Sequence, residues 1–170
     1  MICMANNDSF MQPTTVETRA LLDRCQRYCA TAERCPDDVR QLCRRQGATP
    51  RQTDEVIGLL EQQKYIDCAR YCRAFVHDKV AYQSWGRMKI TMGLRAKRLP
   101  EEHIQAAVAD LDEPVYAANI RKLIRSKRGQ ERQRVVRFML QRGFTFDDLR
   151  RYADYDNDDC EKTYDYENND

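Results

Sequence analysis

A pattern of apolar and turn residues recurs three times along the chain and constrains the fold more than any other feature. The copies align when Gly47, Arg98 and Gly143 are superposed, which gives offsets of 51 and 45 residues. The side chains eight positions before, four positions before and nine positions after are mostly apolar: Val39, Ile90 and Val135; Cys43, Leu94 and Met139; Val56, Ala107 and Tyr152. Self-similarity at such a period is typical of helical units stacked on a shared core. We predict three related units, with a bundle without repeats as the alternative.

The first copy indicates that each unit contains three helices. Apolar residues recur at helical spacing from about Thr15, which predicts an amphipathic helix. Pro36 can begin a second helix, which ends at Gly47. Thr49 can cap a third helix, with Gln52 completing a capping box. The predicted organisation is a flexible lead over residues 1–14, three-helix units over 15–64, 65–111 and 112–154, and an acidic, disordered tail over 155–170.

Composition agrees with an all-α protein. Six glycines and five prolines are few breakers for 170 residues, and 33% of the residues are charged. The chain has no apolar run of about 18 residues and no signal-peptide pattern at its N-terminus. We therefore expect a cytoplasmic protein without a membrane partner.

Charge is distributed unevenly along the chain. Residues 154–170, the acidic segment, carry eight acidic residues and one lysine. The remaining chain holds 28 of the 29 basic and 19 of the 27 acidic residues, a net charge of +9. Such a body attracts an anionic partner. The acidic segment could be a solvated tail, an autoinhibitory lid over a basic face or a DNA mimic. Its tyrosines could help it to fold back on the rest of the chain.

Two stretches carry a resemblance to a known family. Residues 65–100, with Arg73-Ala74-Phe75-Val76 and Trp85-Gly86-Arg87, and residues 134–152, with Arg142-Gly143-Phe144, resemble the RecX family of recombinase regulators. The likeness covers roughly residues 42–153. The sequence departs from the family pattern at Cys68 and Ala69, where acidic residues are usual, and at Arg98, where glycine is commoner.

The resemblance implies a fold, a partner and a function. The fold is an elongated, curved, all-helical array of three tandem three-helix repeats. The partner is the RecA recombinase, and a RecX protein lodges in the groove of the RecA–DNA filament. It inhibits or modulates the recombinase, ATPase and coprotease activities, in recombination, DNA repair and the SOS response. The family carries out no chemistry of its own.

A basic stretch in the middle unit is the candidate binding site. No acidic residue lies between Ser84 and Leu99, so we expect the helix here to present its cations outward, toward carboxylates or phosphates. A solvated basic face is the alternative. Trp85 is either an interface anchor or part of the local core, and the core is favoured. The residues predicted to bind the partner are Arg70, Arg73, Lys79, Trp85, Arg87, Lys89, Arg95, Lys97, Arg98 and Arg142.

A second basic run begins at Arg121 and ends at Arg142, with Glu131 as its only acidic residue. We expect it to spread around two helices rather than to face one partner. Direct binding of single- or double-stranded DNA through the basic faces is therefore the alternative function. A general helical scaffold is a third possibility. Steep salt dependence on bare DNA would distinguish phosphate binding from recombinase recognition.

Catalytic, metal and cofactor sites are not expected. His77 and His103 are the only histidines, and no phosphate-binding glycine loop occurs. Cysteines 25 and 29, and likewise 68 and 72, are four residues apart, which places both on one apolar face of a helix. A thiol there acts as a small apolar group rather than a metal ligand. We predict free thiols, no metal, no cofactor, no small-molecule substrate and no enzymatic activity.

Overall fold

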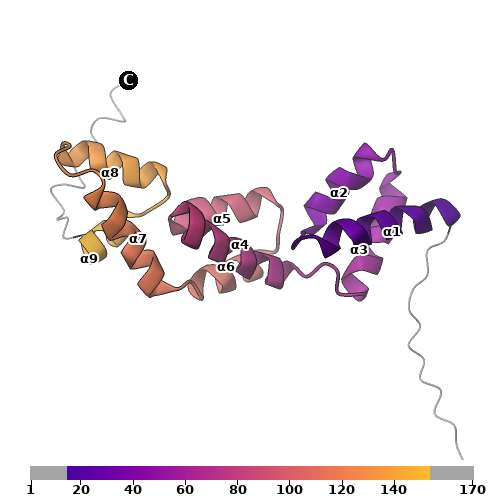
Figure 1. Ribbon diagram of the computed structural model, residues 1–170. Coiled ribbons are helices and arrows are strands. Elements are labelled where there is room, and N and C mark those ends of the chain that lie inside the picture. The colour runs from indigo at the N-terminus through magenta and orange to yellow at the C-terminus, as the bar shows by residue number, and fades with distance from the viewer. Residues whose placement is uncertain (1–14, 154–170) are drawn as a thin grey trace, which may run out of the picture. The chain divides into compact units, whose positions relative to one another are not determined.

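The computed structural model describes residues 15–153, and the regular structure within them is entirely helical (Figure 1). The predicted all-α class is thereby confirmed. The predicted lead over residues 1–14 and tail over residues 155–170 lie outside the described residues. The helices are α1 (Val16–Ala30), α2 (Pro36–Arg45), α3 (Pro50–Gln62), α4 (Cys68–Gln83), α5 (Arg87–Ala96), α6 (Glu101–Ala109), α7 (Glu113–Arg125), α8 (Arg132–Gln141) and α9 (Phe146–Ala153).

The chain divides into two compact units, and the division falls inside α4, between Tyr71 and Cys72. The first unit contains α1, α2, α3 and the first turn of α4. The second contains the rest of α4 and α5 to α9, in which α5 packs against α6 and α7 against α9. The boundaries of three separate units stay a prediction.

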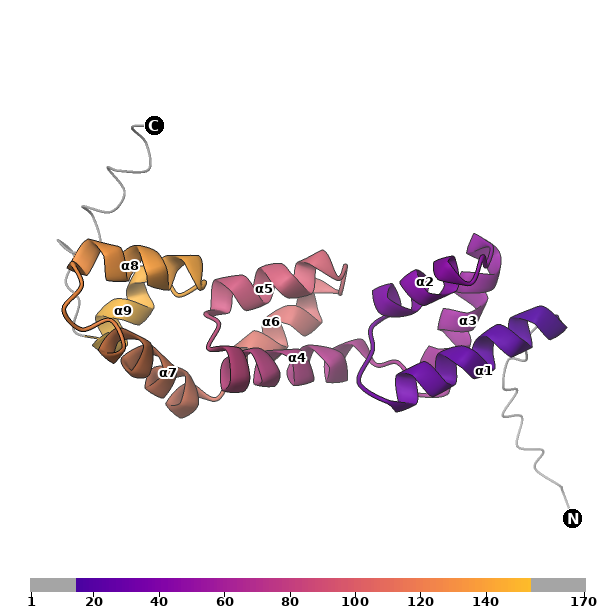
Figure 2. The same ribbon diagram turned by 45° about the horizontal axis from the view of Figure 1, so that its top comes forward.

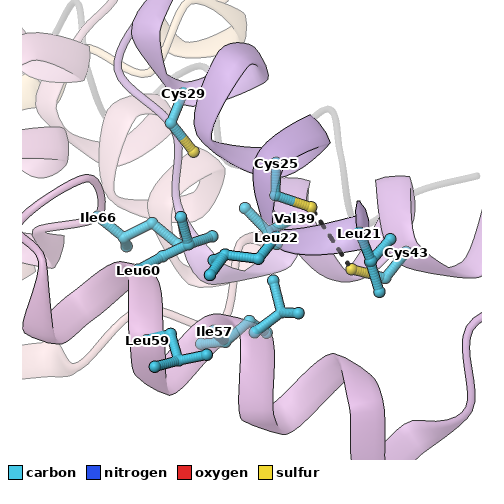
Figure 3. Close-up of a cluster of buried hydrophobic side chains, with 11 residues drawn as sticks. Leu21, Leu22, Cys25, Cys29, Val39, Cys43, Ile57, Leu59, Leu60 and Ile66 are labelled. Atoms are coloured by element: carbon cyan, nitrogen blue, oxygen red, sulfur yellow. Dashed lines mark hydrogen bonds between the residues drawn. The ribbon is translucent and has the colours of Figure 1, made fainter. Parts of the chain in front are cut away.

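The core of the first unit lies between α1, α2 and α3 (Figure 3). Its buried side chains are Leu21, Leu22, Cys25, Cys29, Val39, Cys43, Val56, Ile57, Leu59, Leu60 and Ile66. The Sγ atoms of Cys25 and Cys43 are 3.8 Å apart as free thiols. This thiol–thiol hydrogen bond, together with burial, raises the pKa of Cys25. Cys25 therefore packs as a small apolar group, as its helical spacing predicted.

Local signals place the helix ends of this unit where the sequence indicated. The Thr49 hydroxyl accepts from the Gln52 amide at 3.3 Å, and the Gln52 side chain accepts from the Thr49 amide at 3.0 Å. This is the predicted capping box, and Pro50 occupies the first helical position. Pro36 begins α2 in the same way.

The three turn residues used to align the copies share one backbone conformation. Gly47, Arg98 and Gly143 follow α2, α5 and α8, with φ of 73°, 55° and 84°. This left-handed conformation lets the chain leave the helix. The aligned residues four and eight positions earlier are all buried. Glycine adopts this conformation without strain, whereas for Arg98 it costs about 1 kcal/mol of conformational free energy.

Two glycines join α5 to the end of α8 within the second unit. The Gly86 amide donates to the Arg142 carbonyl at 2.8 Å, and the Met88 amide donates to the Gly143 carbonyl at 3.0 Å. A Cβ on Gly86 would lie 2.1 Å from the Gly143 carbonyl carbon, and one on Gly143 would lie 2.4 Å from the Lys89 amide nitrogen. Figure 2 shows the end of α8 beside the start of α5. The approach therefore requires glycine on both sides, and we call it the glycine junction.

We predict that Gly143→Ala lowers the free energy of unfolding by about 2–4 kcal/mol, because backbone strain adds to a steric clash. Gly129→Ala is the matched control, since φ there is 85° and a Cβ would meet nothing within 4 Å. That variant should lose only about 1 kcal/mol. Urea unfolding followed by circular dichroism measures both, and equal losses would show that the junction is not tightly packed.

Candidate partner-binding surface

Arg87 lies inside an ion-pair network rather than on the outward face of α5. Its Nη1 atom is 2.8 Å from Asp148 Oδ1, and its Nη2 atom pairs with Glu113 Oε2. The guanidinium carbon lies 4.2 Å from the centre of the Tyr116 ring, and only 29% of the side chain is exposed. The outward orientation predicted for Arg87 is therefore wrong. Carboxylates from α7 and α9 draw its side chain inward.

Asp148 is the buried anion of this network. Its Oδ2 atom accepts from the Tyr116 hydroxyl at 2.9 Å and from the Thr145 amide at 2.8 Å. The Tyr116 hydroxyl in turn accepts from the Arg87 amide at 3.2 Å. Burial, and next the Asp148 charge, raise the pKa of Tyr116, so it stays a hydrogen-bond donor. The network ties the starts of α5, α7 and α9 together.

The outward face of α5 carries two methionines and one arginine where an entirely basic face was predicted. Met88 and Met92 are 54% and 65% exposed, and Arg95 follows on the same face, one turn from Met92. Lys89 and Lys97 are half-buried instead. We define Met88, Met92 and Arg95 as the α5 outward face. Methionine and arginine are enriched in protein–protein interfaces, whereas lysine is depleted.

The Arg95 cation is already paired within the chain. Its Nε atom donates to Glu101 Oε2 at 3.0 Å, and this hydrogen bond lowers the pKa of Glu101 to about 2. The pair is exposed, with 55% of the Arg95 side chain accessible. Arg95 can therefore exchange Glu101 for a carboxylate of a partner at little cost.

Trp85 is half-buried beside two lysines. Its ring packs edge-on against Phe75, with centroids 6.4 Å apart. The ammonium groups of Lys79 and Lys89 lie 4.8 Å and 4.7 Å from the indole centre. Trp85 thus contacts Phe75 of α4 and Lys89 of α5 without joining the buried core that was favoured from the sequence, and it attracts two cations by cation–π interaction.

The remaining predicted site residues differ in their surroundings. Arg70 donates to Glu33 at 2.7 Å and to the Lys64 carbonyl at 3.2 Å, so it holds the chain before α4. Arg142 donates to the Gln83 carbonyl at 3.0 Å, which supports the glycine junction. Arg73 and Arg98 are exposed. Partner binding by the ten predicted residues stays a prediction.

Part of the second basic run forms a single surface at α8, which was not predicted from the sequence. A shallow cavity of about 270 Å³ is lined by Lys127, Gln130, Arg134, Arg137, Phe138 and Gln141, which we call the α8 basic surface. The Lys127 ammonium lies 4.5 Å from the centre of the Phe138 ring. Among residues 15–153, no carboxylate lines this cavity. Helical spacing could have revealed it, because positions 134, 137, 138 and 141 share one face of α8.

The second unit also has a mixed cavity of about 230 Å³ between α4, the end of α6 and the start of α7. Arg73, His77 and Asp110 line it together with apolar side chains. Within residues 15–153, no group of three or more His, Cys, Asp or Glu side chains could hold a metal ion. In the same range, no helix combines the length and apolarity needed to cross a membrane.

The described residues thus form an all-helical fold, which can be compared with known proteins. A family model for the second three-helix domain of RecX matches residues 69–108. The regulatory protein RecX of Prosthecochloris aestuarii is 23% identical over 142 residues, covering 81% of this chain and 94% of that protein. Its counterpart from Vibrio parahaemolyticus is 28% identical over 114 residues, covering 62% and 72%.

Solved structures agree in fold. A crystal structure of a regulatory protein RecX superposes with a TM-score of 0.72 at 20% identity, covering 82% of this chain and 74% of that one. RecX from Lactobacillus salivarius superposes with a TM-score of 0.69 at 14% identity, covering 80% and 94%. By sequence and by fold, the chain is therefore similar to RecX proteins.

We predict that Arg87→Ala lowers the free energy of unfolding by about 2–3 kcal/mol, because it leaves the Asp148 carboxylate buried without its cation. Arg95→Ala removes the same guanidinium from an exposed pair on the same helix and should hardly change stability. Urea unfolding of both variants tests this. Equal effects would mean that the Arg87 network is no stronger than a surface ion pair.

Proposed function

We propose that this protein binds the RecA recombinase filament and restrains its activity. The observation that supports this most is the similarity to two regulatory RecX proteins, which match 81% and 62% of this chain. The action is stoichiometric binding in the cytoplasm rather than catalysis, in keeping with a family of regulators.

Contacts within the chain leave only part of the surface available to the recombinase. Arg70, Arg87 and Arg142 are engaged in holding this chain together, so a partner would have to break internal hydrogen bonds to use them. On the α5 outward face only the exposed Arg95–Glu101 pair would have to open, and an exposed ion pair costs little to break. Two exposed methionines can adapt to an apolar partner groove, and Arg95 can pair with a carboxylate beside it. We assign the primary recombinase contact to this face.

Direct nucleic-acid binding is the second candidate function, and the α8 basic surface favours it. Arg134, Arg137 and Lys127 can neutralise phosphates, and the half-buried Phe138 ring offers a stacking surface for a base. Such binding would occur without a recombinase and would weaken steeply with salt.

Co-sedimentation with RecA filaments on single-stranded DNA tests the proposal. We expect Met88→Ser/Met92→Ser to weaken filament binding about tenfold or more, because interface anchors carry most of the binding energy. We expect Arg134→Glu/Arg137→Glu to leave filament binding intact.

A bare single-stranded oligonucleotide serves as the companion probe. Arg134→Glu/Arg137→Glu should abolish any binding to it, whereas the methionine variant should bind as the unaltered chain does. Filament binding that survives the methionine changes but not the arginine changes would overturn the surface assignment. No sedimentation of the unaltered chain with filaments would overturn the proposed function.

A further inference from the structure

The α8 basic surface holds positive charge that the described residues leave unbalanced. Three cations, Lys127, Arg134 and Arg137, line one shallow cavity together with two glutamines and a phenylalanine. Arg134 and Arg137 are exposed, and no ion pair joins them to a carboxylate within residues 15–153. Like charges this close repel one another, so an anion that lies along α8 lowers the electrostatic energy.

We propose that the acidic segment, residues 154–170 of the same chain, occupies the α8 basic surface. It carries eight carboxylates against Lys162 alone, which complements the surface in sign. Guanidinium groups bind carboxylates with paired hydrogen bonds, so Arg134 and Arg137 can each hold one. Tyr155, Tyr164 and Tyr166 alternate with the acidic residues and can pack on Phe138 or on a guanidinium plane.

Connectivity favours this occupant over a separate molecule. The last helix of the described residues, α9, ends at Ala153 and belongs to the same compact unit as α8. Seventeen residues follow, which can span roughly 55 Å when extended, more than the width of a unit of this size. A tether of this kind holds the segment at an effective concentration of about a millimolar. Even weak individual ion pairs can then keep the surface occupied.

Occupation of the α8 basic surface has a consequence for binding. Any phosphate backbone or acidic partner must displace the acidic segment before it reaches Arg134 and Arg137. The segment therefore acts as a built-in competitor that selects for partners with dense negative charge. This contact does not depend on recombinase binding, because it lies on α8 and not on the α5 outward face.

Zero-length cross-linking of the full chain tests the contact. A carbodiimide joins a lysine amine to a carboxylate only where the two groups touch, and mass spectrometry identifies the linked peptides. We expect Lys127 to couple to the acidic segment, and we expect Lys64 and Lys122 to couple to it at least about fivefold less. Those two lysines are exposed and do not line the α8 basic surface.

Charge reversal provides the matched comparison. Arg134→Glu/Arg137→Glu should lower the Lys127 product about tenfold, because two charge-assisted contacts are replaced by repulsion. Arg121→Glu/Arg125→Glu makes the same change in net charge on the neighbouring helix, outside the cavity, and should leave the product within about twofold. Circular dichroism confirms that both variants keep their helices.

Three outcomes would overturn the proposal. One is equal coupling of Lys64, Lys122 and Lys127 to the acidic segment. Another is a Lys127 product that both double variants lower alike. The third is a product found only between two chains, as shown by mixing isotopically labelled and unlabelled protein.

Discussion

The second unit depends on backbone contact between the start of α5 and the end of α8. Helix ends leave amides and carbonyls without partners, and here the two ends satisfy each other. Gly86 and Met88 donate to the carbonyls of Arg142 and Gly143, while opposite ends of two helix dipoles meet. Only residues without a Cβ allow this approach. Once it forms, Arg87 is positioned to reach Asp148 and Glu113, so the ion-pair network follows from the glycine junction.

Features that depend on neighbouring residues could be predicted from the sequence. The helix starts at Pro36 and Pro50, the capping box at Thr49 and the turn positions at Gly47, Arg98 and Gly143 all follow from residues a few positions apart. The direction of Arg87 could not be predicted, because its carboxylate partners stand 26 and 61 residues further along. A count of charges in one stretch cannot show which of them are paired.

The cations of this chain serve two purposes. Arg70, Arg87 and Arg142 hydrogen-bond to carbonyls or carboxylates of the chain and hold its turns and helix starts. Arg134 and Arg137 of α8 and Lys127 of the preceding turn lie together around Phe138. The α5 outward face differs from both, because its exposed methionines suit a protein partner. This separation would let a protein partner and the acidic segment bind one molecule at different places, as we propose.

Native-state hydrogen exchange of the amides at the start of α5 tests the glycine junction most directly. The account predicts that the amides of Gly86 and Met88 open only with the core amides of both α5 and α8, such as those of Ile90 and Val136, at one common free energy. Exchange of Gly86 and Met88 as fast as that of an exposed turn amide would contradict it. Exchange of the α8 core amides while the α5 core amides stay protected would also contradict it.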